Sequence, residues 1–269
     1  MLRVKKLLPI IISIFVLVGC KNEFEAIRLV NDVELRYQKA FEYYEKKDYQ
    51  KAQYLLEDLI GVVRLTDKAE KVYFYYAYTH YHLNSFHFAS YYFKQFYSTF
   101  PTSSYGEEAL YMSAESHYRR SPNYKLSQED TEKAIESFQL FANSFPNSPR
   151  VKSCNQRIDE LRKKLERKAV EAAKDYYKRQ HYRSAIHTFK ALLTEYPDTK
   201  DIEYIRFMVV KSAFRYAQES ILDKQIERFE ETIGYYQQFL KKHRKSEYAL
   251  EAKNIYETSI FKIKKIRNE

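Results

Sequence analysis

The chain has 269 residues, a formal net charge of +10, 4 glycines, 6 prolines, no tryptophan, 27 tyrosines and 18 phenylalanines. Ordinary proteins contain about 7% glycine and 5% proline. So few turn-forming residues argue against an all-β sandwich or barrel and against glycine-rich phosphate-binding loops. The length suffices to bury a core without disulfides or metals, and the composition predicts an all-α protein.

The first residues have the pattern of a secretory leader. Arg3, Lys5 and Lys6 precede an apolar run from Leu7 to Val18, which is too short for a bilayer that needs about 20 residues. The run ends in Leu-Val-Gly-Cys, and this ending resembles the lipobox of bacterial lipoproteins, in which the cysteine is acylated and the chain is cut just before it. We therefore expect residues 1–19 to be a signal peptide and Cys20 to be the lipidated first residue of the mature chain.

Residues 20–32 are expected to form the lipidated N-terminus and a lead-in to the folded part. Lys21, rather than an aspartate, follows the cysteine, which resembles sorting to the outer membrane in Gram-negative bacteria. With lipid on Cys20, Cys154 has no intramolecular partner, so no disulfide is expected. We interpret Cys154 as a small packed residue on a helix.

Five segments share the pattern of a tetratricopeptide repeat, in which the second helix has an alanine, a large residue four positions later and a closing proline. Three segments fit completely and two in part: Ala89, Phe93 and Pro101; Ala134, Phe138 and Pro146; Ala185, Phe189 and Pro197; Ala52 and Leu56; Thr232, Tyr236 and Arg244. The first helix of each unit should contain a small residue where two helices approach closely, and these residues are Ala40, Ala77, Ala114, Ala173 and Ala213. The pattern predicts a solenoid of about five helix-turn-helix units.

The repeat marks are 37 to 51 residues apart, which is longer than the standard 34. We assign the excess to longer turns at 119–130 and 218–228, and to extra helix at 150–168. After Ser246, a stripe of apolar residues predicts a terminal capping helix: Leu250, Ile255, Ile260, Ile263 and Ile266. Residues 33–146 then hold N-terminal units 1–3, and residues 147–269 hold C-terminal units 4–5 with the capping helix.

A lipobox followed by about five tetratricopeptide units of unequal length, closing on Phe-Pro-Thr-Ser or Phe-Pro-Asn-Ser, resembles the BamD family of lipoproteins. These belong to the complex that assembles β-barrel proteins in the bacterial outer membrane. The resemblance implies a non-catalytic scaffold without a cofactor, anchored by lipid to the outer membrane on its periplasmic side. It also implies that N-terminal units bind unfolded outer-membrane proteins, and that C-terminal units bind a BamA-like barrel protein with periplasmic domains, to promote folding and insertion.

Aromatic residues next to the packing positions of the first helices predict a peptide-binding groove: Tyr37, Phe41, Tyr44, Phe74, Tyr78, Tyr81, Tyr111 and Tyr118. Aromatic rings give a large amphipathic contact area at a small entropy cost, which suits binding of varied unfolded chains. The alternative is that these rings only pack between helices, because the chain is rich in aromatic residues throughout.

Basic residues near the C-terminus predict a docking site for an acidic patch on the assembly partner: Lys241, Lys242, Arg244 and Lys245. A solvated helix face is the plain alternative. Nucleic acid is not expected as a partner, because a leader directs the chain out of the cytoplasm.

Catalytic and metal-binding motifs are absent from the sequence. His80 and His82 are close in sequence but on different helix faces, and there is no HExxH, paired CxxC or GxSxG motif. The main alternative function is a periplasmic tetratricopeptide scaffold for cell-wall synthesis or division, although the chain lacks a sustained heptad repeat. An enzyme or a sugar-capturing lipoprotein is disfavoured by the absent tryptophan and the scarce glycine.

Overall fold

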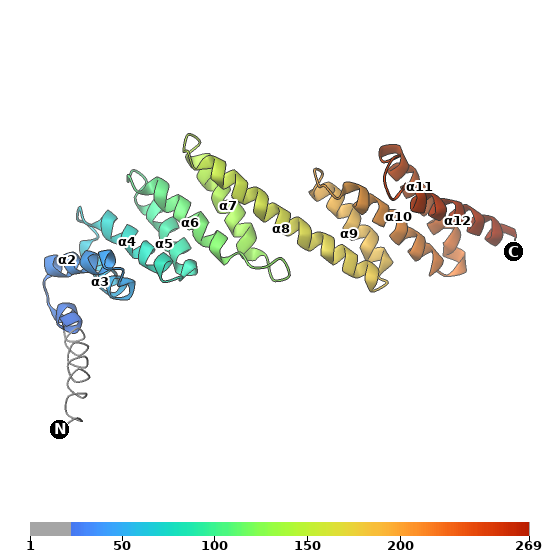
Figure 1. The fold of residues 1–269 in the computed structure, drawn as a ribbon. Coiled ribbons are helices and arrows are strands. Elements are labelled where there is room, and N and C mark those ends of the chain that lie inside the picture. Colours follow the sequence, from blue (N-terminus) through green and yellow to red (C-terminus); the bar gives the residue numbers. More distant parts are fainter. Residues whose placement is uncertain (1–22, 269) are drawn as a thin grey trace, which may run out of the picture. The chain divides into compact units, whose positions relative to one another are not determined.

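The computed structural model describes residues 23–268, and these residues form helices and turns without a strand. The chain divides into two compact units, with the boundary after Leu161. Helices α2–α12 follow one another along the chain (Figure 1). The signal peptide and Cys20 lie outside the described residues, and the grouping into residues 33–146 and 147–269 stays a prediction.

Unit 1 contains three helical hairpins followed by the first part of a long helix. The hairpins are α2 (Val33–Glu45) with α3 (Tyr49–Val63), α4 (Ala69–His82) with α5 (Phe86–Thr99), and α6 (Gly106–Arg120) with α7 (Glu129–Ser144). The long helix is α8 (Val151–Lys178). Its Cys154, Ile158 and Leu161 are buried in one cluster with Phe138 and Phe141 of α7. A short helical segment, residues 23–29, precedes α2.

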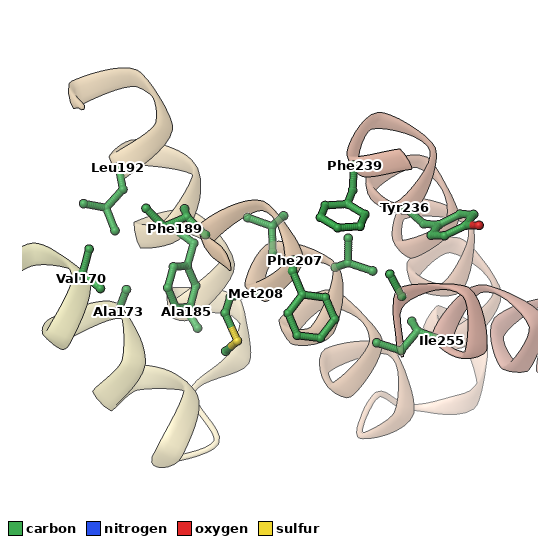
Figure 2. Close-up of a cluster of buried hydrophobic side chains, with 14 residues drawn as sticks. Val170, Ala173, Ala185, Phe189, Leu192, Phe207, Met208, Tyr236, Phe239 and Ile255 are labelled. Carbon is green, nitrogen blue, oxygen red and sulfur yellow. The ribbon is translucent and has the colours of Figure 1, made fainter. Parts of the chain in front are cut away.

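Unit 2 contains the rest of α8 and four further helices. These are α9 (Tyr182–Glu195), α10 (Ile202–Gln218), α11 (Leu222–Lys242) and α12 (Ala249–Asn268). One apolar cluster joins all five helices (Figure 2), and its members include Val170, Phe189, Phe207, Phe239 and Ile255. The all-α repeat fold with a terminal helix is therefore confirmed.

The positions that define the repeat are buried in all five hairpins. The small residues of the first helices are at most 2% exposed: Ala40, Ala77, Ala114, Ala173 and Ala213. The small residues of the second helices are fully buried: Ala52, Ala89, Ala134, Ala185 and Thr232. A side chain larger than these would hold the paired helices apart, since protein interiors have few voids.

The turn that closes a hairpin is tied back to the first helix of that hairpin, near its start in all but α8. Proline follows Phe100, Phe145 and Tyr196, where three second helices end. Two residues after each proline, a hydroxyl accepts a backbone N–H and donates to a glutamate: Ser103 to Glu70 at 2.6 Å, Ser148 to Glu107 at 2.7 Å, and Thr199 to Glu166. The first and fifth hairpins use a basic side chain in place of the hydroxyl, because Glu34 pairs with Lys68 and Glu203 lies 3.4 Å from Nδ1 of His243. We call these contacts the glutamate closures.

Two of the three expected insertions are confirmed. A long turn of residues 121–128 separates α6 from α7, and residues 151–168 are helical within α8. The expected long turn at 218–228 is wrong, because α11 already begins at Leu222. The segment from Leu222 to Arg228 contains no glycine or proline, and most of its residues have good helix propensity, so the insertion extends the helix.

The capping helix is confirmed as α12, but one of its expected core residues is not. Leu250 is 71% exposed, whereas Ile255 and Ile263 are buried. Ala252 and Ser259 are also fully buried on α12. A buried face set by Ala252, Ile255, Ser259 and Ile263 follows the helical period and leaves Leu250 on the solvent side.

Cys154 is a free cysteine packed in the core of unit 1, as expected from the sequence. Burial raises the pKa of its thiol to about 11, with the charge of Arg150 acting in the opposite direction. The thiol is therefore protonated at neutral pH and is a poor nucleophile.

Two phenylalanines of α5 test the packing. Phe93 is fully buried and Phe88 is 52% exposed. We expect Phe93→Ala to lower the stability by about 3–5 kcal/mol through cavity formation and Phe88→Ala to change it by no more than about 0.5 kcal/mol. Urea unfolding followed by far-ultraviolet circular dichroism measures both, and equal midpoints for the two variants would contradict the assigned core.

Candidate peptide-binding surface

The eight aromatic residues expected to bind peptide lie on three successive first helices of unit 1. Tyr37, Phe41 and Tyr44 are on α2; Phe74, Tyr78 and Tyr81 are on α4; and Tyr111 and Tyr118 are on α6. Seven are partly buried, whereas Phe74 is only 5% exposed and packs on Phe93, Phe96 and Tyr105. Together with the start of α8, these helices form what we call the first-helix face.

Tyr75 joins the aromatic residues of α2 to those of α4. Its ring lies 5.2 Å from Phe41 and 4.8 Å from Tyr44, in edge-to-face geometry. Such pairs add about 0.5–1.5 kcal/mol beyond the buried area. Lys71 places its ammonium 4.4 Å from the centre of the Phe41 ring. Tyr75 was not among the residues predicted from the sequence, which include its neighbour Phe74.

His82 forms a polar edge to this aromatic group. Its Nε2 lies 3.1 Å from the hydroxyl oxygen of Tyr44, and its ring stacks on Tyr49 at 4.2 Å. Burial and, secondarily, the charge of Lys47 lower the pKa of His82. The imidazole is therefore neutral at neutral pH, and it extends the ring surface without adding charge.

A double ladder of charged and aromatic side chains links α4, α6 and α8. The Tyr78 hydroxyl donates to Glu108 at 2.5 Å, Glu108 pairs with Arg150, and the Arg150 guanidinium lies 4.6 Å from the Tyr111 ring centre. Seven residues further along the chain, the glutamate, arginine and tyrosine contacts recur without a partner from α4: Glu115 lies 3.9 Å from Arg157, and Arg157 lies over the Tyr118 ring at 4.0 Å. Two helical turns separate Glu108 from Glu115 on α6, while Arg150 directly precedes α8 and Arg157 lies on it.

The second rung contains an incompletely paired acid. Glu115 has a side chain only 12% exposed, and its buried Oε2 makes no hydrogen bond within the described residues. Desolvation raises the pKa of this carboxyl, and the nearby Arg157 and Arg119 offset the increase only in part. Tyr118 is better satisfied, because its hydroxyl donates to Glu160 at 3.1 Å.

Sequence reasoning found the tyrosines of this face but missed their charged partners. Two of these partners, Glu108 and Glu115, lie on α6. The other two, Arg150 directly before α8 and Arg157 on it, follow only after the whole of α7. The sequence offers one signal for them: the two glutamates are seven residues apart, and so are the two arginines. Arg150 and Arg157 appeared only as part of a basic stretch.

The basic residues expected to dock a partner are exposed in unit 2. Lys241 and Lys242 end α11, and Arg244 and Lys245 follow it in the turn before α12. Cations at this position also interact favourably with the negative end of the helix dipole. The sequence missed a cavity of about 660 Å³ between α9 and α11, whose basic lining residues include Arg183, Lys190 and Arg228.

The fold and these surfaces define a class of protein. Unit 1 presents a broad amphipathic face, and unit 2 presents a basic surface. The part of the chain that the structure describes holds no group of three or more His, Cys, Asp or Glu suited to a metal ion. Among the described residues, no helix is long and apolar enough to cross a membrane. The protein is a tetratricopeptide-type helical-repeat protein.

Comparison with known families identifies it further. The chain belongs to the YfiO family, described as outer membrane lipoprotein, whose sequence model matches residues 31–203 and 167–266. This is the BamD family expected from the lipobox and the repeats, and membership implies a role in outer-membrane protein assembly. No curated protein matches the chain significantly.

Among solved structures, the chain is similar to tetratricopeptide domains at low identity. The P58(IPK) domain is 14% identical, with 92% of this chain and 67% of that chain covered and a TM-score of 0.40. A thermophilic repeat protein of Thermus thermophilus is 13% identical, with 86% and 100% covered and a TM-score of 0.32. The TPR2AB domain of yeast Sti1, solved in complex with pHSP90, is 14% identical, with 87% and 88% covered and a TM-score of 0.37.

The raised pKa of Glu115 predicts a pH effect on stability. Between its ordinary value of 4.5 and the raised value, the folded state binds more protons than the unfolded state, so this residue's contribution falls as pH rises. We expect Glu115→Gln to raise the unfolding midpoint at neutral pH, and this gain to vanish below about pH 4.5. Thermal unfolding across this range measures it.

The control for this prediction is Glu136→Gln on α7, where the side chain is exposed. It should change the midpoint little at any pH. If the Glu115→Gln variant is less stable than the wild type at neutral pH, the inference that the charge of Glu115 destabilises the folded state is wrong.

Proposed function

We propose that this protein is a non-catalytic lipoprotein scaffold of the outer-membrane protein assembly machinery. In this proposal the first-helix face binds unfolded β-barrel substrates, and the basic surface of unit 2 docks the barrel-type assembly partner, so that folding and insertion occur at the membrane. Lipid on Cys20 holds the protein on the periplasmic side of the outer membrane. Family membership supports the general role, and the double ladder supports the assignment of the substrate site.

The double ladder suits a ligand without a fixed sequence. Tyr78, Tyr111 and Tyr118 each expose part of a ring while the rest packs, so they present apolar area that is already ordered. An extended chain that binds there loses little entropy on the protein side. The pairs between carboxylate and guanidinium supply both acceptors and donors for the unpaired backbone groups of an unfolded strand.

Docking through unit 2 rests on charge. Lys241, Lys242 and Arg244 lie within one turn of the end of α11 and are exposed. Complementary charge at the rim of an interface accelerates association and selects partners more than it adds affinity. A partner domain with an acidic patch meets this requirement.

Photocrosslinking tests the substrate site. A photoreactive phenylalanine analogue at Tyr118 is expected to crosslink to an unfolded outer-membrane barrel protein, and the same analogue at Tyr91, which is 58% exposed on α5, is expected not to. Replacing Tyr111 and Tyr118 by alanine should weaken binding by about 5- to 30-fold, since contacts of this kind contribute one or two kcal/mol. Equal crosslinking at both positions would refute a specific first-helix site.

Charge reversal tests the docking site. We expect glutamate at Lys241, Lys242 and Arg244 to reduce co-purification with the barrel-type partner by about tenfold, mainly through slower association that depends on ionic strength. A matched control places the same three reversals at Lys152, Arg162 and Lys163 of α8, which are also exposed. The assignment fails if the two variants bind the partner equally at physiological salt.

A further inference from the structure

The first hairpin carries an exposed apolar strip that the substrate site does not use. Leu65 is 96% exposed and Tyr54 56% exposed, and Val62 beside them is 51% exposed. Tyr54 and Gly61 are seven residues apart on α3, about two helical turns, and therefore lie on the same side of this helix. Leu65 follows in the turn after α3 ends at Val63. Gly61 has open space around it. We call Tyr54, Gly61, Val62 and Leu65 the α3 strip.

The segment that enters the first hairpin lies against the same helix. Phe24 and Ile27 of residues 23–29 are buried in the cluster formed by α2 and α3. The Phe24 ring lies 6.4 Å from the Tyr54 ring, and the Arg28 guanidinium lies 5.8 Å from it. The segment then ends in Leu29, which is 84% exposed, and Val30. The orientation of the hairpin is thus fixed relative to the point where the chain enters it.

The distance from that point to the lipid anchor is short. Cys20 precedes Glu23 by three residues, and three residues span at most about 10–11 Å when fully extended. A lipidated Cys20 has its backbone at the membrane–water interface. Glu23 must therefore lie within about 10–11 Å of the headgroups and the buried Phe24 within about 13–14 Å, and the first hairpin cannot move away from the bilayer without unpacking Phe24 and Ile27.

We propose that the α3 strip, with Leu29 and Val30, lies in the interfacial layer of the membrane that holds the lipid anchor. The strip is the apolar surface that so short a tether brings to the bilayer. Tyrosine favours the headgroup region and leucine and valine the acyl boundary. The exposed Glu57 and Asp58 lie between Tyr54 and Gly61 along α3, at the level of the headgroups, where lipid ammonium groups can pair with them. This contact rests on lipidation of Cys20 in the proposed function.

Environment-sensitive fluorescence tests the contact in the full-length lipidated protein. A nitrobenzoxadiazole label is placed on Tyr54→Cys or Leu65→Cys, in a Cys154→Ala background, and the protein is reconstituted into vesicles of phosphatidylethanolamine and phosphatidylglycerol. The matched control is Leu140→Cys on α7, where the native side chain is 41% exposed. We expect a blue shift at positions 54 and 65 and quenching by lipids with spin-labelled chains, with neither effect at position 140.

The other outcomes separate this inference from the proposed function. If the mass of the N-terminal peptide shows lipid and the protein binds vesicles, yet the labels at 54 and 65 keep their emission in water, the contact is refuted and the anchor stands. If the labels lose contact with water only when a partner protein is added, and spin-labelled lipids do not quench them, the strip is a protein interface and the inference is wrong. If Cys20 carries no lipid, both the anchor and the contact fail.

Discussion

Close approach of paired helices at a small residue is the constraint on which the rest of the structure depends. Ala40, Ala77, Ala114, Ala173 and Ala213 occupy the first helices, and each hairpin has a matching alanine or threonine on its second helix. A hairpin of this kind cannot bury its apolar face alone, so it requires a neighbour on that side. The glutamate closures act at the open ends of the hairpins, where a turn and a helix start must be kept together. Hydrogen bonds to a charged group contribute about 1.5–3 kcal/mol, more than neutral ones.

Helix α8 shows what happens where the repeat is interrupted. Its first half packs Cys154, Ile158 and Leu161 onto the third hairpin, and its second half supplies Val170 and Ala173 to unit 2. The fourth glutamate closure, Glu166 with Thr199, begins in the middle of this helix. This helix also brings Arg157 to the first-helix face, and Arg150 lies directly before its first residue. The inserted segment thus also provides the arginines of the candidate site.

The sequence predicted the fold well because its signals are local. Alanine, a large residue four positions later and a closing proline all lie within one hairpin, and they mark the same places in the structure. The errors arose where a local pattern has two solutions. The segment 218–228 can be a turn or a helix, and only the absence of helix-breaking residues decides it. Leu250 fits an apolar stripe, but Ala252 sets the buried face of α12.

The site could be predicted only in part, for a different reason. Tyrosines adjacent to packing positions were recognisable, but the burial of Phe74 and the central place of Tyr75 depend on which neighbour each ring meets. The two ion pairs, Glu108 with Arg150 and Glu115 with Arg157, each join residues that have the whole of α7 between them in the sequence. Nothing in a single sequence relates such residues except their equal spacing.

The abundance of tyrosine has a physical reason in this architecture. On the first-helix face a ring must pack against a neighbouring helix and still reach solvent, and the hydroxyl of tyrosine allows both. Tyr78 and Tyr118 bond to Glu108 and Glu160, while their rings contact Phe93, His82 and Arg157. Phenylalanine instead fills the fully buried positions at 93, 96, 138, 141 and 189. The same tyrosines join the hairpins and form the exposed surface. Under the proposed function, binding at this face would therefore be coupled to the packing of the repeats, and a ligand that filled it would also stabilise unit 1.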